Sequence, residues 1–195
     1  MAISIAKGME KENVIATYKH FPGYGKSQKD AHLSLPIIDK DYKYLMSHDL
    51  VPFKNAILEN AKMIMVGHEA LPKITNDNIP ASLNKKIITD ILINELEFNG
   101  LIITDALNMK AVCDNYSDDD IAVMAINAGA DILLMPNDPL KYISYIKENV
   151  SEDIINSKVK KILKFKYLYL NNDSIYDSSL LNDSSYNNVI DKIKE

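Results

Sequence analysis

Four ionisable residues lie close together near the N-terminus, with a spacing that is compatible with a catalytic site: Lys19, His20, Asp30 and His32. Lys19 and His20 follow residues 14–18, a β-branched and aromatic run that predicts a buried strand. The proline and two glycines that come next stop this strand and force a turn. The loop beyond the turn holds an acid and an imidazole two positions apart, and imidazole titrates near neutral pH. Structural loops rarely gather so many ionisable groups, so we interpret this strand end and loop as a site.

Two further ionisable residues follow predicted strands. His68 ends the apolar run 61–67, and Asp105 ends the run 101–104. In a parallel barrel the active site lies at the carboxyl ends of the strands and is built from several of them. We therefore expect His68 and Asp105 at the same face as Lys19 and His20. Taken alone, however, an Asp at a strand end often caps the next turn, and a His at a strand end can be a buried structural residue.

The composition indicates a globular chain and excludes some partners. The chain has 195 residues, of which 47% are hydrophobic and 25% charged, so it can bury a sizeable core. Its net charge of -5 comes without a basic stripe, which argues against a nucleic-acid partner. All 22 positive charges are Lys, so a bidentate guanidinium grip on a carboxylate or phosphate is not available. The single cysteine, Cys113, excludes an internal disulfide and a thiolate zinc cluster.

No segment of the sequence predicts membrane insertion or export. No apolar run approaches the ~18 to 20 residues of a transmembrane helix, and the N-terminus has no basic region before an apolar stretch. We therefore expect no membrane partner and a cytoplasmic location. A cell-envelope or extracellular location is the alternative if another segment of the intact enzyme precedes this chain.

Apolar periodicity predicts alternating strands and helices. Predicted strands cover 14–20, 61–67, 101–104 and 131–135, and predicted helices cover 2–13, 39–46, 52–60, 82–98, 121–128, 138–148 and 151–170, with a loop at 74–80. Near-continuous apolar strands alternating with helices predict an α/β fold with a parallel sheet. A (β/α)8 barrel of the TIM type needs eight strands and ~250 residues, so four strand-helix units make about half of one. We expect this half-barrel over residues 1–170 and a polar tail over 171–195.

The residues around these positions resemble bacterial β-N-acetylhexosaminidases of glycoside hydrolase family 3. The first matching block is Lys-His-Phe-Pro-Gly-Tyr-Gly at 19–25 with Asp-Ala-His at 30–32. Four further blocks agree in order: Met-Val-Gly-His at 65–68, Pro-Ala-Ser-Leu at 80–83, the run from Phe98 to Met109, and the run from Ala128 to Met135. The resemblance covers roughly residues 1–170 and implies the C-terminal half of the family's catalytic barrel.

The resemblance implies retaining hydrolysis of a terminal β-linked N-acetylglucosamine, typically from cell-wall fragments. Asp105 would be the nucleophile that forms a glycosyl-enzyme intermediate. His32 would protonate the leaving oxygen and then activate water, while Asp30 would orient its imidazole. A retaining glycosidase needs a carboxylate nucleophile and a second group that changes from acid to base, and an imidazole suits the second role.

The resemblance also implies a substrate-binding set and no metal. Lys19 and His20 would hold sugar hydroxyls, and His68 would line the same pocket. The partner would be a saccharide that contains N-acetylglucosamine, and no metal or organic cofactor would be required.

The sequence departs from the family pattern in side chains and in length. Tyr24 stands where the family usually has His, Ala31 where it has Ser, and Ile93 where an Arg is common. We expect modest effects from these changes. The four preceding strands of the family's barrel, which should supply an Asp and an Arg that grip the sugar, have no counterpart in this sequence.

Two alternatives to an active glycosidase stay open. His20, His68 and Asp105 could ligate a divalent metal, as in barrel hydrolases that use a metal-bound water. Against this, no His pair has ligand spacing, and Lys19 would repel a cation. Alternatively, the chain is a non-catalytic half-barrel that exposes sheet edges, and it would then self-associate or recruit its missing N-terminal half.

Overall fold

The computed structural model describes residues 1–25, 31 and 33–169. Asp30, His32 and the predicted tail at 171–195 therefore lie outside the described residues. The α-helices are α1 (Ala2–Lys11), α2 (Tyr42–Tyr44), α3 (Val51–Leu58), α4 (Pro72–Thr75), α5 (Lys110–Cys113), α6 (Asp118–Ala128), α7 (Pro139–Asn149) and α8 (Glu152–Tyr169). Segments of other helical types are the π-helices η1 (Leu45–Asp49) and η3 (Lys86–Glu95) and the 3-10 helix η2 (Ala81–Leu83).

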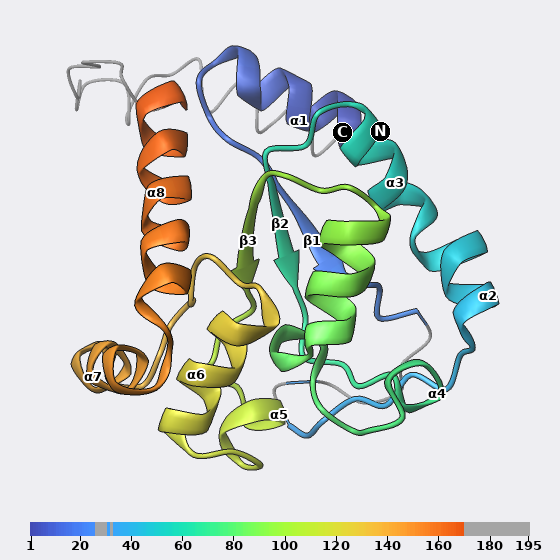
Figure 1. The fold of residues 1–195 in the computed structure, drawn as a ribbon. Coiled ribbons are helices and arrows are strands. Elements are labelled where there is room, and N and C mark those ends of the chain that lie inside the picture. The colour runs from blue at the N-terminus through green and yellow to red at the C-terminus, as the bar shows by residue number, and fades with distance from the viewer. Residues whose placement is uncertain (26–30, 32, 170–195) are drawn as a thin grey trace, which may run out of the picture.

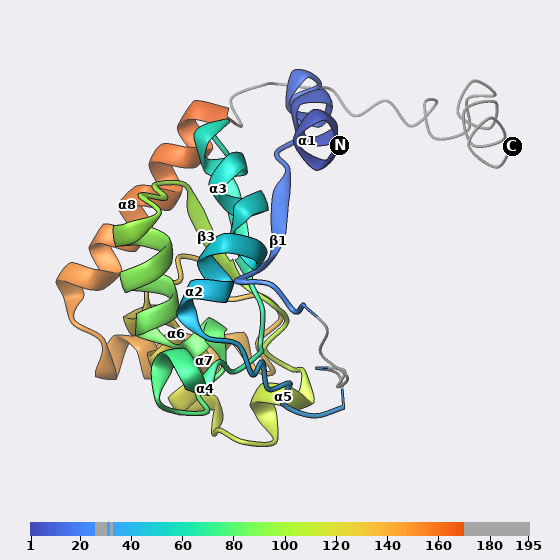
Figure 2. The same cartoon turned by 90° about the vertical axis from the view of Figure 1, so that its right-hand side faces the viewer.

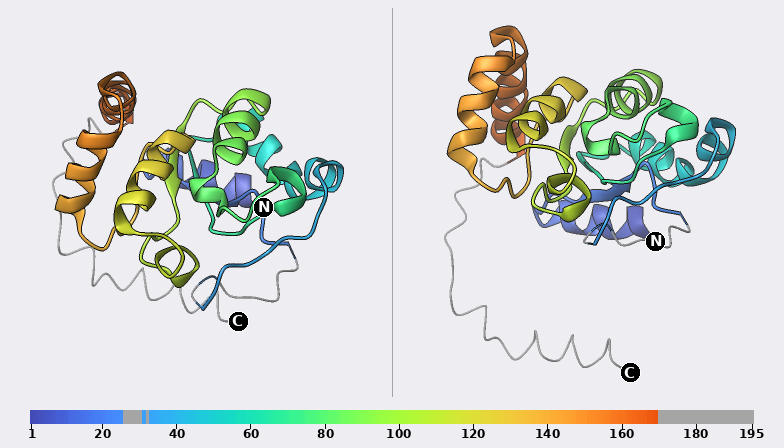
Figure 3. Two further views of the ribbon diagram at one scale, coloured as in Figure 1. Left: turned by 60° about the horizontal axis from the view of Figure 1, so that its bottom comes forward. Right: turned by 90° about the horizontal axis from the view of Figure 1, so that it is seen from below.

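A parallel sheet lies at the centre of the chain. Its strands β1 (Thr17–Phe21), β2 (Met63–Val66) and β3 (Leu101–Thr104) are hydrogen-bonded in the order β1-β2-β3. The helices between the strands pack outside the sheet, and α3, α6 and α8 lie on one side of it (Figures 1 and 2). Seen along the strands, helices from α8 through α6 to α3 form an arc (Figure 3). This arrangement confirms the predicted α/β fold as a partial (β/α) barrel.

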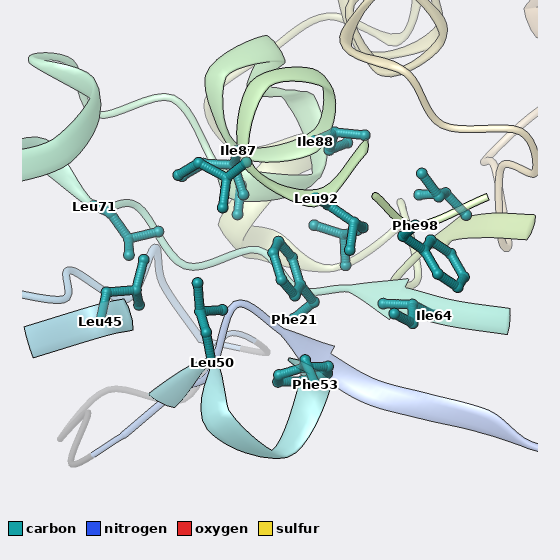
Figure 4. Packing of buried hydrophobic residues seen from close by; sticks show 14 of the residues in the cluster. Phe21, Leu45, Leu50, Phe53, Ile64, Leu71, Ile87, Ile88, Leu92 and Phe98 are labelled. Carbon is teal, nitrogen blue, oxygen red and sulfur yellow. The ribbon is translucent and has the colours of Figure 1, made fainter. Parts of the chain in front are cut away.

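The main core lies between the sheet and this arc of helices. Phe21 at the end of β1 packs edge-to-face on Phe53 of α3, with ring centroids 5.2 Å apart. Figure 4 shows Phe21 among Leu50, Phe53, Ile64 and Leu92, all of which are buried. Burial of large apolar side chains is the dominant favourable term in folding. This core therefore fixes β1 and β2 against the helices and sets the position of the strand ends.

The opposite face of the sheet is only partly covered. Met63 and Met65 of β2 and Ile103 of β3 alternate with buried neighbours and are themselves half-exposed. In a complete (β/α)8 barrel, side chains at such positions fill the interior in layers. This face of the partial barrel thus presents apolar side chains that a closed barrel would bury.

The helix before β3 begins later than the sequence predicts. Ser82, the first residue of the predicted helix and of a type that often caps helices, lies in η2, and its hydroxyl group contacts His68 instead. The side chain of Asn84, two residues before η3, accepts a hydrogen bond from the backbone N–H of Lys86, the first residue of η3. The apolar face predicted for this helix is confirmed, since Ile87, Ile88, Ile91 and Leu92 are buried.

The predicted strand at 131–135 is reduced to a single bridge between Ile103 and Ile132. The backbone N–H of Leu134 donates to the hydroxyl of Thr104 rather than to a strand carbonyl, and Met135 has a φ of 48°, which an extended strand does not allow. Backbone hydrogen bonds join Ile132 to Ile102 and Thr104, but the ladder does not continue beyond Ile132. The loop predicted at 74–80 is also shorter, because α4 extends to Thr75.

The helix predicted at 121–128 is confirmed as α6, which begins earlier, at Asp118. The acidic run Asp118–Asp120 forms the first turn of α6, where the helix dipole favours negative charge. Gly129 ends this helix with a φ of 123°, a conformation that suits glycine. Among the described residues, no helix is long and apolar enough to cross a membrane.

Replacement of Asp138 by Ala is expected to cost about 1 kcal/mol of the free energy of unfolding. One oxygen of the Asp138 carboxylate, Oδ1, accepts hydrogen bonds from the backbone N–H groups of Leu140, 3.1 Å away, and Lys141, 3.2 Å away, at the start of α7. Urea denaturation followed by circular dichroism measures the change. Asp138→Asn is the control, because it keeps an oxygen at the cap, and an equal loss in both variants would contradict capping as the cause.

Candidate active site

The ends of β1 and β3 bring His20 and Asp105 together. The Nε2 atom of His20 lies 3.6 Å from Oδ2 of Asp105, and the side chains are 29% and 15% exposed. The backbone N–H of Asp105 donates to the carbonyl of Val66 at 2.8 Å, and that of Gly67 donates to the carbonyl of Phe21 at 2.9 Å. These bonds continue the sheet pattern just past the strands and hold both side chains at its carboxyl edge.

The two oxygens of the Asp105 carboxylate have different surroundings. Oδ1 accepts a hydrogen bond of 2.9 Å from the backbone N–H of Ala106, whereas Oδ2 faces His20. The first contact fixes the plane of the carboxylate. The second oxygen lies beside an imidazole, and because the side chain is 15% exposed, this carboxylate can reach a ligand at the strand ends.

His20 is neutral at neutral pH. Its partial burial lowers its pKa, the negative charge of Asp105 opposes this shift, and the positive charge of Lys19 adds to it. The ring of Tyr24 contacts His20 edge-on, with centroids 5.4 Å apart. A neutral imidazole held in this way can both donate and accept a hydrogen bond, as binding of a sugar hydroxyl requires.

His68 also lies at this edge, but its side chain is completely buried. Its Nε2 atom is 2.9 Å from the carbonyl oxygen of Ala106, and its Nδ1 atom is 2.8 Å from the hydroxyl of Ser82. A carbonyl can only accept, so Nε2 carries the proton and Nδ1 accepts from Ser82. His68 therefore holds the backbone directly after Asp105, and a direct contact of His68 with sugar stays a prediction.

Lys19 is exposed at the strand end, next to His20. With His20, Gly23 and Tyr24 it lines an open pocket of ≈ 690 Å³ that extends across the edge of β1 toward α1 and α3. Asp105 does not line this pocket. Lys19 and His20, which are predicted to hold sugar hydroxyls, therefore lie near the predicted nucleophile Asp105. In the described part of the chain, however, the three residues do not line one enclosed cavity.

Asp30 and His32 lie outside the described residues, but Ala31 between them is placed. Ala31 is buried, and its carbonyl oxygen accepts a hydrogen bond of 3.2 Å from the backbone N–H of Ala111 in α5. Its methyl group packs with Met109, in the segment that follows Asp105. This anchor joins the loop of the predicted dyad to the segment after β3.

The described residues do not favour the metal alternative. They contain no cluster of three or more His, Cys, Asp or Glu side chains that could hold a metal ion. Both ring nitrogens of His68 are already engaged by Ser82 and Ala106. His20 and Asp105 thus remain a pair, without His68 as a third ligand.

Sequence reasoning missed Glu69, which directly follows His68. This side chain is completely buried, and burial raises its pKa to about 8. The charge of Asp105 raises the pKa further, although less than burial does. The sequence signal was a carboxylic acid in the stretch 63–72, where His68 is the only other polar side chain, a place where such a group requires an explanation.

Comparison with known proteins identifies the family of this chain. The model of the glycosyl hydrolase family 3 N-terminal domain matches residues 1–165. Beta-hexosaminidase from Idiomarina loihiensis is 36% identical over 138 residues, which cover 71% of this chain and 41% of the relative. Beta-hexosaminidase A from Pseudoalteromonas piscicida is 33% identical over 147 residues, 70% of this chain and 25% of the relative.

Solved structures give the same result. A glycoside hydrolase family 3 β-N-acetylglucosaminidase from Paenibacillus sp. superposes with a TM-score of 0.83 and 29% identity over 91% of this chain and 36% of that one. The β-N-acetylglucosaminidase from Thermotoga maritima superposes with a TM-score of 0.74 and 34% identity, over 82% of this chain and 36% of that one. The chain spans about a quarter to two fifths of the length of the curated relatives it matches. The fold, the order of the motifs and these matches together show that the chain belongs to glycosyl hydrolase family 3.

Proposed function

We propose that this chain carries the nucleophile side of a retaining β-N-acetylhexosaminidase site, which removes terminal β-linked N-acetylglucosamine from cell-wall-derived glycans. The observation that supports this most is the pairing of His20 with Asp105 at the carboxyl ends of β1 and β3. Barrel enzymes place their reacting groups at this face. The curated relatives are named beta-hexosaminidases, and the proposal assigns their chemistry to this chain.

In this mechanism Asp105 attacks the anomeric carbon through Oδ2, the oxygen that is not held by Ala106. His32 gives a proton to the leaving oxygen and Asp30 orients its imidazole. Water, activated by His32, then releases the sugar from Asp105, so the product keeps the β configuration. Lys19 and His20 hold sugar hydroxyls during both steps, and His68 fixes the backbone that carries Asp105.

The described residues do not enclose the substrate pocket completely. Met63, Met65 and Ile103 leave the inner face of the sheet half-covered, and the pocket beside His20 is open. We propose that a second copy of the chain or an N-terminal half-barrel completes it. In the alternative, the chain is a non-catalytic half-barrel, and it then folds and binds without turnover.

Hydrolysis of a chromogenic β-N-acetylglucosaminide by the purified chain tests the proposal, with light scattering on the same sample. Turnover, together with β-N-acetylglucosamine as the first product seen by NMR, would support a retaining site. Its concentration dependence would show whether self-association completes the pocket. Absence of turnover in a folded sample at every concentration would contradict activity of this chain alone and favour the half-barrel alternative.

A further inference from the structure

Glu69, three residues after the end of β2, is completely buried. Among the described residues, neither oxygen of its carboxyl group has a hydrogen-bond partner. An ionised carboxylate without a partner is costly in such surroundings. The neutral acid is therefore the form that this site accommodates, in accordance with the raised pKa.

The carboxyl group fills the space between the end of β2 and the turn after β1. A Cβ atom on Gly67 would overlap Oε2 of Glu69 and would lie 3.0 Å from a ring carbon of Tyr24. The backbone N–H groups of Gly23 and of Glu69 itself favour the charged form without reaching hydrogen-bond geometry to either carboxyl oxygen, and burial outweighs both. Glu69 thus packs under the Gly23–Tyr24 turn, and Gly67 leaves the space that it occupies.

This turn connects Glu69 to the proposed site. Tyr24 contacts His20, and His20 lies 3.6 Å from Asp105. On the other side of the turn, Asp49 lies against Gly23 and forms an ion pair of 2.6 Å with Lys40. The titratable groups around Glu69 and the turn are Asp105, His20, Tyr24, His68, Asp49 and Lys40.

Among these groups, the charge of Asp105 acts on Glu69. Asp49 is already paired with Lys40, and His68 is turned toward Ser82 and Ala106. Asp105, in contrast, opposes a second negative charge at Glu69. Opening of the turn would admit water to the carboxylate. It would therefore lower the free-energy cost of ionising Glu69.

We propose that Glu69 is a positioning residue whose neutral carboxyl group holds the Gly23–Tyr24 turn, and through Tyr24 the imidazole of His20, in place beside Asp105. Loss of the proton releases the turn. The benefit of this positioning for hydrolysis rests on the proposed function, but the packing itself does not, and it can be tested in a chain without activity.

Hydrogen exchange measured by mass spectrometry on a peptide that covers 17–25 tests the proposal between pH 6 and pH 9. A carboxyl with a folded-state pKa above its unfolded-state value stabilises at low pH and loses this effect as the pH rises. After correction for the intrinsic exchange rate, opening of the turn should increase at least about tenfold over this range, mostly below pH 8. Glu69→Gln keeps the size and neutrality of the acid and should abolish this increase.

Glu148 on α7 is exposed, so Glu148→Gln is the matched control and should behave like the unchanged chain. Peptides from α6 and α7 report global unfolding and should exchange alike in all variants. The proposal is overturned if Glu69→Gln keeps the pH dependence of the turn, or if it already loses protection there at pH 6. The second result would mean that the ionised carboxylate holds the turn.

Discussion

Replacement of Asp105 by Asn is expected to lower hydrolysis of a β-N-acetylglucosaminide at least about 1,000-fold, or roughly 4 kcal/mol in the activation barrier. The amide keeps the size of the side chain, and its oxygen can still accept from Ala106 N–H. It removes the negative charge that attacks the anomeric carbon. The measured quantity is kcat/KM of the purified chain, in the oligomeric state that shows turnover.

The matched control for this variant is Asp90→Asn on the exposed surface of η3, which should leave kcat/KM unchanged. Circular dichroism and urea denaturation would show whether the Asp105 variant is folded. Residual activity above one tenth of the original, in a folded sample, would remove Asp105 from the role of nucleophile. The substitution also tests the metal alternative, because a two-residue site of His20 and Asp105 would lose bound metal along with activity.

The strand that carries the proposed nucleophile was predictable from sequence because its signal is local. The run 101–104 is apolar and ends at Asp105, and β3 has these bounds. Likewise, Val14 to Tyr18 predicted a strand before His20, although β1 begins later, at Thr17. Local patterns thus indicated which side chains stand at strand ends. The resemblance supplied their proposed roles.

Features set by tertiary contacts were not predictable in this way. Ser82 has the residue type of a helix cap, but the buried imidazole of His68 needs its hydroxyl, so the helix starts beyond it. The strand predicted at 131–135 does not extend beyond its bridge at Ile132, because the backbone N–H of Leu134 donates to the side chain of Thr104. Burial of Glu69 depends on the absence of a side chain at Gly67. The contact between these two residues is set by the fold and has no signal in the sequence.

Replacement of Asp131 by Ala is expected to destabilise the chain by about 3 kcal/mol. The carboxylate is fully buried and accepts from the backbone N–H of Ile102 at 2.9 Å. Lys158 and Lys161 of α8 bind its two oxygens at 3.0 Å and 2.5 Å. Removal of the carboxylate leaves a buried N–H group without its acceptor and two lysines without their counter-charge, so the loss should exceed that of a surface ion pair.

The effect should be largest in α8, because none of its described residues is buried and its two lysines are joined to β3 through the carboxylate of Asp131. Hydrogen exchange over 152–169 should show opening of α8 before the sheet unfolds. Lys158→Met and Lys161→Met, alone and combined with Asp131→Ala, form double-mutant cycles that separate the two ion pairs from the bond to Ile102. Equal exchange of α8 in Asp131→Ala and in the unchanged chain would show that apolar packing, and not this carboxylate, holds the helix.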